Sequence, residues 1–286
     1  MQPPEVQGTI HREGPVRQYV SSTITITNPL ETEVKLESRC DNPQVILPED
    51  LALRPGADTQ IEIKYRPLLV TETASSLTLA SAELGDYAYD LKLQGSNAGL
   101  ERSIAFNVPL GTKETKAFRF MHFHQDKCEY TCKFLGSDKL GFESEPSVVA
   151  HSAGPEGIEV EVEITYEPTM IGENFRDTLV VSSPQGGEYR CPVVGRCVNP
   201  KPVGPFVVKG SAQVPFKNVM GSEVTYQFSC DNPAFKVKET ESIPSKRTVQ
   251  IPISYTASDE HAKTSKLVIS CAESEGTKWC FYLQGE

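Results

Sequence analysis

The feature that most constrains the fold of this chain is that its sequence repeats itself. The tetrapeptide Cys40-Asp41-Asn42-Pro43 recurs at residues 230–233, an offset of 190. When that offset is held without a gap, 19 of the 73 positions between residues 23 and 95 are identical. The identities follow the alternating apolar positions, which a chance match of four residues does not explain. The sequence therefore predicts a folding unit that occurs more than once.

A third, looser copy lies between these two. The box at 61–67, with the pattern Ile-x-Ile-x-Tyr-x-Pro, reappears in related form at 162–168 and at 251–257. Each copy then closes with an aromatic strand that runs into a glycine, namely Gly95, Gly195 or Gly285. The copies are roughly 85–100 residues long, the size of a β-sandwich domain. We therefore expect three domains, over residues 1–97, 98–199 and 200–286.

The segments within each copy alternate between apolar and polar residues, the pattern of half-buried antiparallel strands. In the segment 158–164, apolar side chains face one way, while Glu159, Glu161 and Glu163 face the other. Turn-forming residues separate such runs at the short spacing that is typical of a β-sandwich. No helical period exceeds one turn, although Pro48–Leu53 is expected to form a short helical turn. The predicted fold is all-β, with three tandem immunoglobulin-like sandwiches.

The segments that join the copies are short, and the second contains two prolines. They cover residues 95–99 and 195–204. Because proline restricts the backbone, little swivelling is expected there. The three domains should therefore form a semi-rigid rod.

The chain is acidic, and its charge is unevenly distributed. Its formal charge of −10 divides into −6 for residues 1–97, −5 for 98–199 and +1 for 200–286. Binding to nucleic acid requires a basic face and is not expected. Direct contact with the acidic tubulin lattice is likewise not supported by the two acidic domains. No apolar run of 18 residues exists, and no basic segment precedes an apolar run at the N-terminus, so neither membrane insertion nor a secretory signal is expected.

Three short motifs, in this order, resemble those of ASH domains, a group of immunoglobulin-like sandwiches related to major-sperm-protein domains. They are the segment 28–30 after an alternating strand, the box at 61–67 and 162–168, and the segment 85–95. Copy two lacks the Cys-Asp-Asn-Pro turn, and copy three has Thr256-Ala257 where the others end the box with proline. Tandem arrays of this kind look most like hydin and the hydin-like cilia- and flagella-associated proteins. The resemblance implies a structural or docking component of cilia, centrosomes or axonemal microtubules.

The eight cysteines suggest a chain that keeps its thiols reduced. They are Cys40, Cys128, Cys132, Cys191, Cys197, Cys230, Cys271 and Cys280. An extracellular immunoglobulin array would place one pair at equivalent positions of each domain, whereas these copies hold one, four and three. No Asn-x-Ser/Thr sequon occurs either. Reduced, half-buried cysteines in a cytoplasmic compartment are therefore expected.

One cluster in copy two has the composition of a metal site. His122 and His124 would share a face of a strand, and Cys128 and Cys132 follow four and eight residues after His124. Two imidazoles and two thiolates could complete a tetrahedral zinc shell. The alternative is a phenylalanine-rich strand with exposed histidines and incidental cysteines, and we assign no metal on this pattern.

The other singled-out residues are interpreted as structural. The Cys-Asp-Asn-Pro segments are expected to form β-turns in which Asp and Asn bond the local backbone. The box tyrosines Tyr65, Tyr166 and Tyr255 are expected to be core residues with backbone-bonded hydroxyls. The stripe of Glu159, Glu161 and Glu163 is expected to be a solvated strand face.

No pattern of a phosphate-binding loop, zinc protease or serine-hydrolase elbow occurs, so no catalytic residue and no cofactor is predicted. The favoured function is a non-enzymatic scaffold segment that binds other proteins of an axonemal complex in a cilium or flagellum. Two alternatives remain: an extracellular adhesion array, and an adaptor of the major-sperm-protein type that binds short acidic peptides. The adaptor would need a basic groove, for which only domain three supplies residues: Lys209, Lys217, Lys236, Lys238, Lys246 and Arg247.

Overall fold

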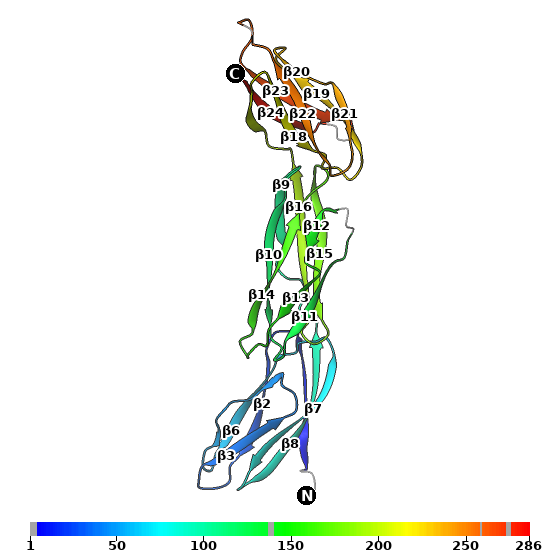
Figure 1. Ribbon diagram of the computed structural model, residues 1–286. Coiled ribbons are helices and arrows are strands. Elements are labelled where there is room, and N and C mark those ends of the chain that lie inside the picture. Colours follow the sequence, from blue (N-terminus) through cyan, green and yellow to red (C-terminus); the bar gives the residue numbers. More distant parts are fainter. Residues whose placement is uncertain (1–4, 137–139, 258, 273–275) are drawn as a thin grey trace.

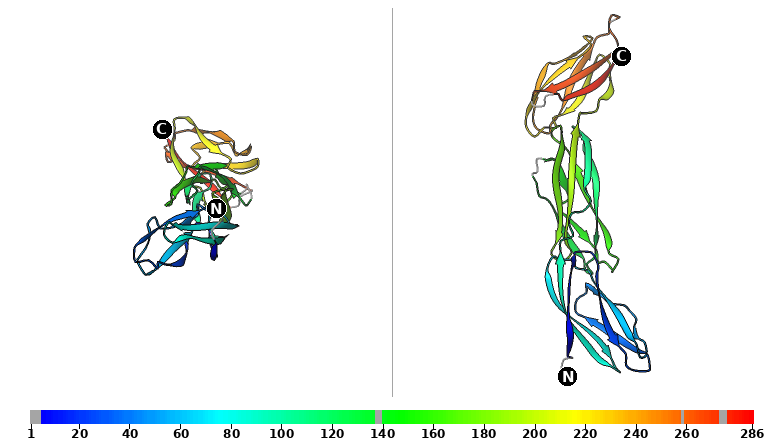
Figure 2. Two further views of the ribbon diagram at one scale, coloured as in Figure 1. Left: turned by 90° about the horizontal axis from the view of Figure 1, so that it is seen from below. Right: turned by 180° about the vertical axis from the view of Figure 1, so that it is seen from behind.

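Three β-sandwiches follow one another along an elongated molecule, with the two termini at opposite ends (Figure 1). The computed structural model describes residues 5–136, 140–257, 259–272 and 276–286. Viewed along the length of the molecule, the first sandwich extends to one side of the other two (Figure 2). Among the described residues, no helix is long and apolar enough to cross a membrane. The all-β fold with three sandwich units confirms the prediction made from the repeats.

Within the described residues, each sandwich consists of eight strands. The first comprises β1 (Val6–Pro15), β2 (Val20–Thr27), β3 (Val34–Cys40), β4 (Val45–Ile46), β5 (Leu51–Leu53), β6 (Asp58–Tyr65), β7 (Glu72–Ser81) and β8 (Gly85–Ser96). The second comprises β9 (Ile104–Pro109), β10 (Glu114–His122), β11 (Cys128–Phe134), β12 (Phe142–Ser144), β13 (Ser147–Ala150), β14 (Ile158–Tyr166), β15 (Gly172–Ser183) and β16 (Gly187–Val198). The third comprises β17 (Val203–Val208), β18 (Ser211–Lys217), β19 (Val224–Cys230), β20 (Phe235–Val237), β21 (Thr240–Ile243), β22 (Thr248–Tyr255), β23 (Thr264–Cys271) and β24 (Lys278–Gly285).

All three sandwiches have the same topology. A five-stranded sheet has the order β1-β8-β7-β3-β5 in the first, β9-β16-β15-β11-β13 in the second and β17-β24-β23-β19-β21 in the third. A three-stranded sheet faces it, ordered β2-β6-β4, β10-β14-β12 and β18-β22-β20. In each sandwich the first strand runs parallel to the last, and the other pairings are antiparallel. The sequence repeat therefore corresponds to a structural repeat, strand for strand.

The period-two pattern of the sequence explains how each core forms. In β14, Val160, Val162 and Ile164 are buried, while the intervening glutamates are exposed or partly exposed. Each sandwich has its own apolar cluster between its two sheets. One local expectation was wrong, because residues 51–53 form strand β5 and not a helical turn. Leu51 and Leu53 both point into the core, an alternation that suits a strand better than a helix.

Candidate functional site: the joints between sandwiches

The two joints are built on the same short turn. We call the end of a sandwich that faces the C-terminus of the chain its apical end, and the opposite end its basal end. The apical turn that links the first two strands is Pro15–Gln18 in the first sandwich and Pro109–Thr112 in the second. Its second residue is Val16 in one and Leu110 in the other, and these are 4% and 2% exposed. The first and second sandwiches thus each carry one buried apolar side chain in the turn that faces the next sandwich.

The third position of this turn has a left-handed backbone in both copies. Its φ angle is 67° at Arg17 and 90° at Gly111. Glycine adopts this region without strain, whereas a residue with a side chain rarely does. An arginine held there suggests that its contacts offset the strain.

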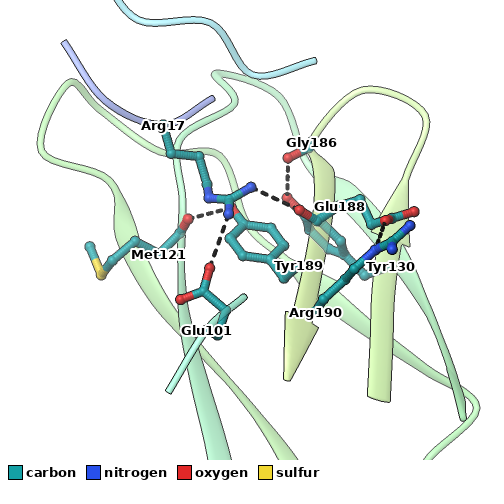
Figure 3. A network of polar contacts seen from close by, with 8 residues as sticks. All are labelled: Arg17, Glu101, Met121, Tyr130, Gly186, Glu188, Tyr189 and Arg190. Atoms are coloured by element: carbon teal, nitrogen blue, oxygen red, sulfur yellow. Dashed lines mark hydrogen bonds and ion pairs between the residues drawn. The ribbon is translucent and has the colours of Figure 1, made fainter. Parts of the chain in front are cut away.

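Arg17 makes those contacts with the second sandwich (Figure 3). Its Nη1 donates a hydrogen bond to the carbonyl oxygen of Glu188 at 2.8 Å, and its Nη2 pairs with Glu101 Oε1 at 3.0 Å. The guanidinium lies 4.1 Å from the ring centroid of Tyr189. The Tyr189 hydroxyl in turn donates to the carbonyl oxygen of Met121 at 2.5 Å. Charge-assisted bonds and a cation–π contact therefore meet at one side chain, which is only 10% exposed.

Arg66 forms a second link across the same joint, just after β6. It donates from Nη1 to the carbonyl oxygen of Pro155 at 2.7 Å. Its guanidinium lies 4.1 Å from the ring centroid of Phe123 and 4.7 Å from that of Tyr19. Burial lowers its pKa, but an arginine in a protein stays protonated. The first joint is therefore held by two buried cations that lie against aromatic rings.

The second joint is mainly apolar. Leu110 belongs to the core cluster of the third sandwich, together with Val219 and Met220 of the loop after β18. Gly111 lies beside Val219, and a Cβ added to it would be 3.4 Å from Val219 Cγ1 and 3.9 Å from Trp279 Nε1. The turn of the second sandwich thus inserts directly into the base of the third.

An ion-pair cluster flanks this second joint. Glu167, one residue beyond β14, lies 3.1 Å from Lys217 Nζ and 3.8 Å from Lys246 Nζ. Burial alone would raise the pKa of the Glu167 carboxyl. The hydrogen bond from Lys217 and the charges of Lys217, Lys246 and Lys113 outweigh burial, so the pKa lies below its ordinary value.

This shift predicts that the second joint weakens in acid. A carboxyl whose pKa is lowered in the folded state stabilises the fold above its ordinary pKa of about 4.3 and loses that contribution as the pH falls through the lowered value. Because the side chains at these contacts are 33–45% exposed, we expect less than about 1 kcal/mol. The measurement compares the pH dependence of Tm for the wild-type chain and Glu167→Gln. The stability difference should be present at neutral pH and vanish in acid. A difference that persists below the carboxyl titration would contradict this assignment.

A buried asparagine shapes the basal loop that receives the turn. In the third sandwich, Asn218 Nδ2 donates to the carbonyl oxygens of Ser222 at 2.9 Å and Ile243 at 2.8 Å. Its Oδ1 accepts from the Met220 amide at 2.9 Å and from the Tyr226 hydroxyl at 2.7 Å. Asn218 is fully buried, so these four bonds fix the loop that carries Val219 and Met220.

The same position is occupied by Asn28 in the first sandwich. Its Nδ2 donates to the carbonyl oxygens of Thr32 at 2.9 Å and Leu53 at 3.2 Å. Its Oδ1 accepts from the Leu30 amide at 3.0 Å. We call Asn28, Asn218 and their counterpart in the second sandwich the lock residues.

That counterpart is His122. Its Nδ1 lies 2.7 Å from the Tyr130 hydroxyl, eight residues further along, as Asn218 and Tyr226 are eight residues apart. His122 is fully buried, and burial lowers its pKa, which favours the neutral ring. The structure thus gives this histidine a structural role that the sequence comparison, which aligned only copies one and three, did not reveal.

The structure does not bring the proposed zinc ligands together. Strand β10 ends at His122, so His124 lies in the following loop, where its Nδ1 accepts from the Asp126 amide at 3.1 Å. Cys128 and Cys132 both lie in β11 and are buried. Burial raises the pKa of Cys132 to about 11, which favours the thiol over the metal-binding thiolate. In the described ranges, no three His, Cys, Asp or Glu side chains form a group that could hold a metal ion.

The Cys-Asp-Asn-Pro turns are confirmed. Asn42 Oδ1 accepts from the amide of residue 44 at 2.9 Å, and Asn232 Oδ1 accepts from that of residue 234 at 3.0 Å. Asp41 and Asp231 reach the neighbouring strand, where they accept from the amides of residues 76 and 266 at 2.9 and 2.8 Å. The recurrence of this tetrapeptide therefore has a structural cause, which is to fasten the turn to β7 or β23.

The box tyrosines are buried, as predicted. Tyr65, Tyr166 and Tyr255 are 2%, 0% and 7% exposed. The rings of the last two lie against the closing glycines, where an added Cβ would be 2.5 Å from Tyr166 and 2.4 Å from Tyr255. The expected backbone bond is absent at Tyr166, whose hydroxyl has no hydrogen-bond partner among the described residues.

The charged residues singled out from the sequence lie at the surface. Glu159 and Glu161 pair with Arg119 at 3.8 and 3.0 Å, and Glu163 is exposed. The basic residues of the third sandwich are spread over several elements, and four of them form ion pairs: Lys209, Lys217, Lys238 and Lys246. Lys236 and Lys238 line an open groove of about 520 Å³ across β18, β20 and β22.

A second groove, of about 580 Å³, lies across the first joint. It is lined by the apical turn, by residues 68–70 and 97–99 of the first sandwich and by residues 182–184 of the second. Of the joint residues, Lys217 and Lys246 were singled out from the sequence, but as part of a basic groove and not of a joint. The signal that could have found the joints is the pair Pro15-Val16 and Pro109-Leu110, in which an aliphatic residue follows the proline that ends the first strand.

The fold and the joints define this chain as a tandem immunoglobulin-like β-sandwich protein. No family model matches it. The chain is homologous to a segment of the Hydrocephalus-inducing protein homolog of Homo sapiens and of the Hydrocephalus-inducing protein of Mus musculus. It is 34% identical to each over 286 aligned residues, 97% of this chain. It spans only 6% of the length of either relative.

Solved structures match this chain only at low overall similarity. The Bacteroides ovatus mixed-linkage glucan utilization locus protein SGBP-B, in complex with a mixed-linkage heptasaccharide, matches with a TM-score of 0.25 and 12% identity. The match covers 100% of this chain and 69% of that one. Mouse clustered PcdhgC3 EC1-3 matches with a TM-score of 0.23 and 11% identity, covering 85% of this chain and 88% of that one. These scores carry no information about what the chain binds.

Proposed function

We propose that the chain is a non-enzymatic structural segment of a ciliary or flagellar assembly, with its domains at residues 1–97, 98–199 and 200–286. The observation that carries this proposal is homology to the hydrocephalus-inducing proteins over nearly the whole chain. The sequence resemblance to ASH domains supports the same setting. From the sequence motifs we further expect a resemblance to cilia- and flagella-associated protein 47.

The joints suggest how such a segment works. Two interdomain contacts with equivalent turns hold three sandwiches in line, which suits a spacer that sets distances within a large complex. Free sheet edges along the rod offer unpaired backbone groups to a partner strand. We propose that the partners are other proteins of an axonemal complex, and that the location is cytoskeletal, in the axoneme.

Localisation tests this proposal directly. The tagged protein, expressed in ciliated cells, is expected along the cilium and is expected to remain with axonemes after detergent extraction. Proximity labelling should then recover axonemal proteins. A protein that is excluded from cilia, or that is released completely with the detergent-soluble fraction, would contradict the proposal.

The cysteines distinguish this proposal from an extracellular adhesion array. No disulfide bond occurs in the part of the chain that the structure describes, and burial raises the pKa of Cys191 to about 12 and of Cys197 to about 11. We therefore expect the unreduced protein to show eight free thiols in denaturant. Under native conditions, only Cys40, Cys230 and Cys280, which are partly exposed, should react rapidly. Titration with a thiol-specific chromophore measures both counts, and oxidised pairs within one sandwich would favour the adhesion array.

A further inference from the structure

The basal end of the first sandwich has the same architecture as the two basal ends that form joints. Strand register identifies a matching aromatic residue in each sandwich. Leu77 of β7 pairs with Tyr89, Leu179 of β15 with Cys191, and Leu267 of β23 with Phe281. The residues two positions before Tyr89, Cys191 and Phe281 are Tyr87, Tyr189 and Trp279. These three residues therefore occupy one structural position.

In the second and third sandwiches, this aromatic residue contacts the turn of the preceding sandwich. Tyr189 lies under Arg17, and the indole nitrogen of Trp279 faces Gly111. The loop after the lock residue contributes the other half of the contact. Phe123 follows His122 and lies under Arg66, while Val219 follows Asn218 and packs with Leu110. An aromatic residue and the loop after the lock residue thus form a socket.

The first sandwich has a socket that no described residue fills. It consists of Pro29 and Leu30, which follow the lock residue Asn28, and of Tyr87. Leu30 is 36% exposed and Pro29 is exposed, whereas Val219 and Met220 at the same positions of the third sandwich are 3% and 9% exposed. Asn28 fixes the loop through the three hydrogen bonds described above, so the open socket is preformed.

Charge indicates what the socket accepts. Four exposed acidic residues lie close in sequence to Leu30 and Tyr87, namely Glu31, Glu33, Glu83 and Asp86, and the exposed Arg54 lies on the loop whose Gly56 amide donates to the Leu30 carbonyl. At the second joint, the acidic Glu167 of one sandwich meets two lysines of the next. At the first, the basic Arg17 meets Glu101. Opposite charges face one another at both joints. We therefore expect the acidic basal end of the first sandwich to bind a basic apical turn.

We propose that the base of the first sandwich is a docking surface for the apical turn of a further sandwich domain of this kind. The turn presents a basic residue to Tyr87 and the acidic rim, as Arg17 does to Tyr189 and Glu101 at the first joint. It presents an aliphatic residue to Leu30, as Leu110 does to the loop of Val219 and Met220 at the second joint. The proposal depends on the geometry of the joints and not on a ciliary location. The docking test can therefore fail without contradicting the function proposed above, and the localisation test can fail without contradicting the docking proposal.

The test extends the full chain at its N-terminus by a second copy of residues 5–97, joined to residue 4. The added copy supplies its own Val16 and Arg17 as the docking turn. Because the strands of the sandwiches are equivalent, the chain that joins the copy to the original first sandwich has the same length as the chain that joins the first sandwich to the second. Amide relaxation is expected to show the added copy and the original first sandwich reorienting together. Leu30→Gln in the original first sandwich is expected to release the copy, which then reorients faster. Val149→Gln, at an exposed valine of edge strand β13, should leave the copy docked.

Two results would overturn the proposal. One is an added copy that shows the resonances of a folded sandwich but reorients independently without any substitution. The other comes from the unextended chain, and so does not require the copy to fold. There, Leu30→Gln should leave Tm unchanged, because the socket is open. A fall in Tm of several degrees would show that Leu30 serves the core of its own sandwich.

Discussion

Asn218→Ala is expected to destabilise the third sandwich by about 3–5 kcal/mol, the largest effect of any polar substitution that we predict. The substitution removes four hydrogen bonds at a fully buried position. Two carbonyls, one amide and the Tyr226 hydroxyl lose this partner, and a buried polar group without a partner costs more than the bond itself contributed. Because Val219 and Met220 depend on the same loop, the second joint should loosen as well.

Urea denaturation followed by tryptophan fluorescence measures this effect. The chain has one tryptophan, Trp279, which is 6% exposed in the third sandwich and therefore reports on that sandwich alone. Gln213→Ala, at an exposed position of β18 in the same sandwich, is the matched control, and its effect should stay within about 0.5 kcal/mol. If Asn218→Ala were as mild as the control, the account of the lock residues would be wrong.

Arg17→Ala combined with Arg66→Ala is expected to free the first sandwich from the second. The pair supplies charge-assisted hydrogen bonds to Glu101 and to two backbone carbonyls, together with contacts to three aromatic rings. At about 1.5–3 kcal/mol for a hydrogen bond to a charged group, a coupling of at least about 3 kcal/mol is lost. Alanine is as strained as arginine in the left-handed backbone at position 17, so the substitution does not offset the lost contacts by relieving that strain. The sandwiches themselves should stay folded, because neither arginine belongs to an apolar core cluster.

Single-molecule energy transfer between dyes on the first two sandwiches measures the change. Attachment through non-cysteine chemistry avoids the eight native thiols. The wild-type chain is expected to give one narrow distance distribution, and the double variant a broad one. Arg39→Ala is the control, since Arg39 is 76% exposed and pairs with Glu37 on its own strand. An unchanged distribution in the double variant would show that the arginines do not hold the joint.

Self-comparison of the sequence predicted most of the fold. The offset of 190 aligned Cys40 with Cys230 and Tyr65 with Tyr255, and each pair occupies equivalent strands. Repetition makes the alternation of apolar and polar residues easier to recognise, because the same core positions must be apolar in every copy. The interpretation of the Asp-Asn segments as turns was correct for the asparagines, whose Oδ1 atoms accept from the amide two residues further on. The aspartates were expected to bond the local backbone, but they bond a strand 35 residues away.

The lock position of the second sandwich was not recognised, because different chemistry fills it. Asparagine uses both ends of its amide at Asn28 and Asn218, whereas His122 reaches the Tyr130 hydroxyl with one ring nitrogen. A sequence comparison scores this exchange as a mismatch. The nearby cysteines then made the histidine resemble a metal ligand, although their side chains point into the core.

The joints could not be predicted because their contacts link residues far apart in the sequence. Arg17 and Glu188 are separated by 171 positions, and Arg66 and Pro155 by 89. Period-two patterning decides which face of a strand is buried, but it does not report what happens at strand ends, where these residues lie. Pro48–Leu53 was misjudged for a related reason, since a three-residue strand is too short to show a period.

The central claim is that equivalent turn-and-socket joints hold the three sandwiches as one semi-rigid rod. Backbone residual dipolar couplings from the full chain in dilute alignment medium test it most directly, because each sandwich reports its own orientation. The account predicts that a single alignment tensor, with the orientations of Figure 1, fits all three sandwiches. Three tensors of different magnitude would show sandwiches that move independently, and would contradict the account.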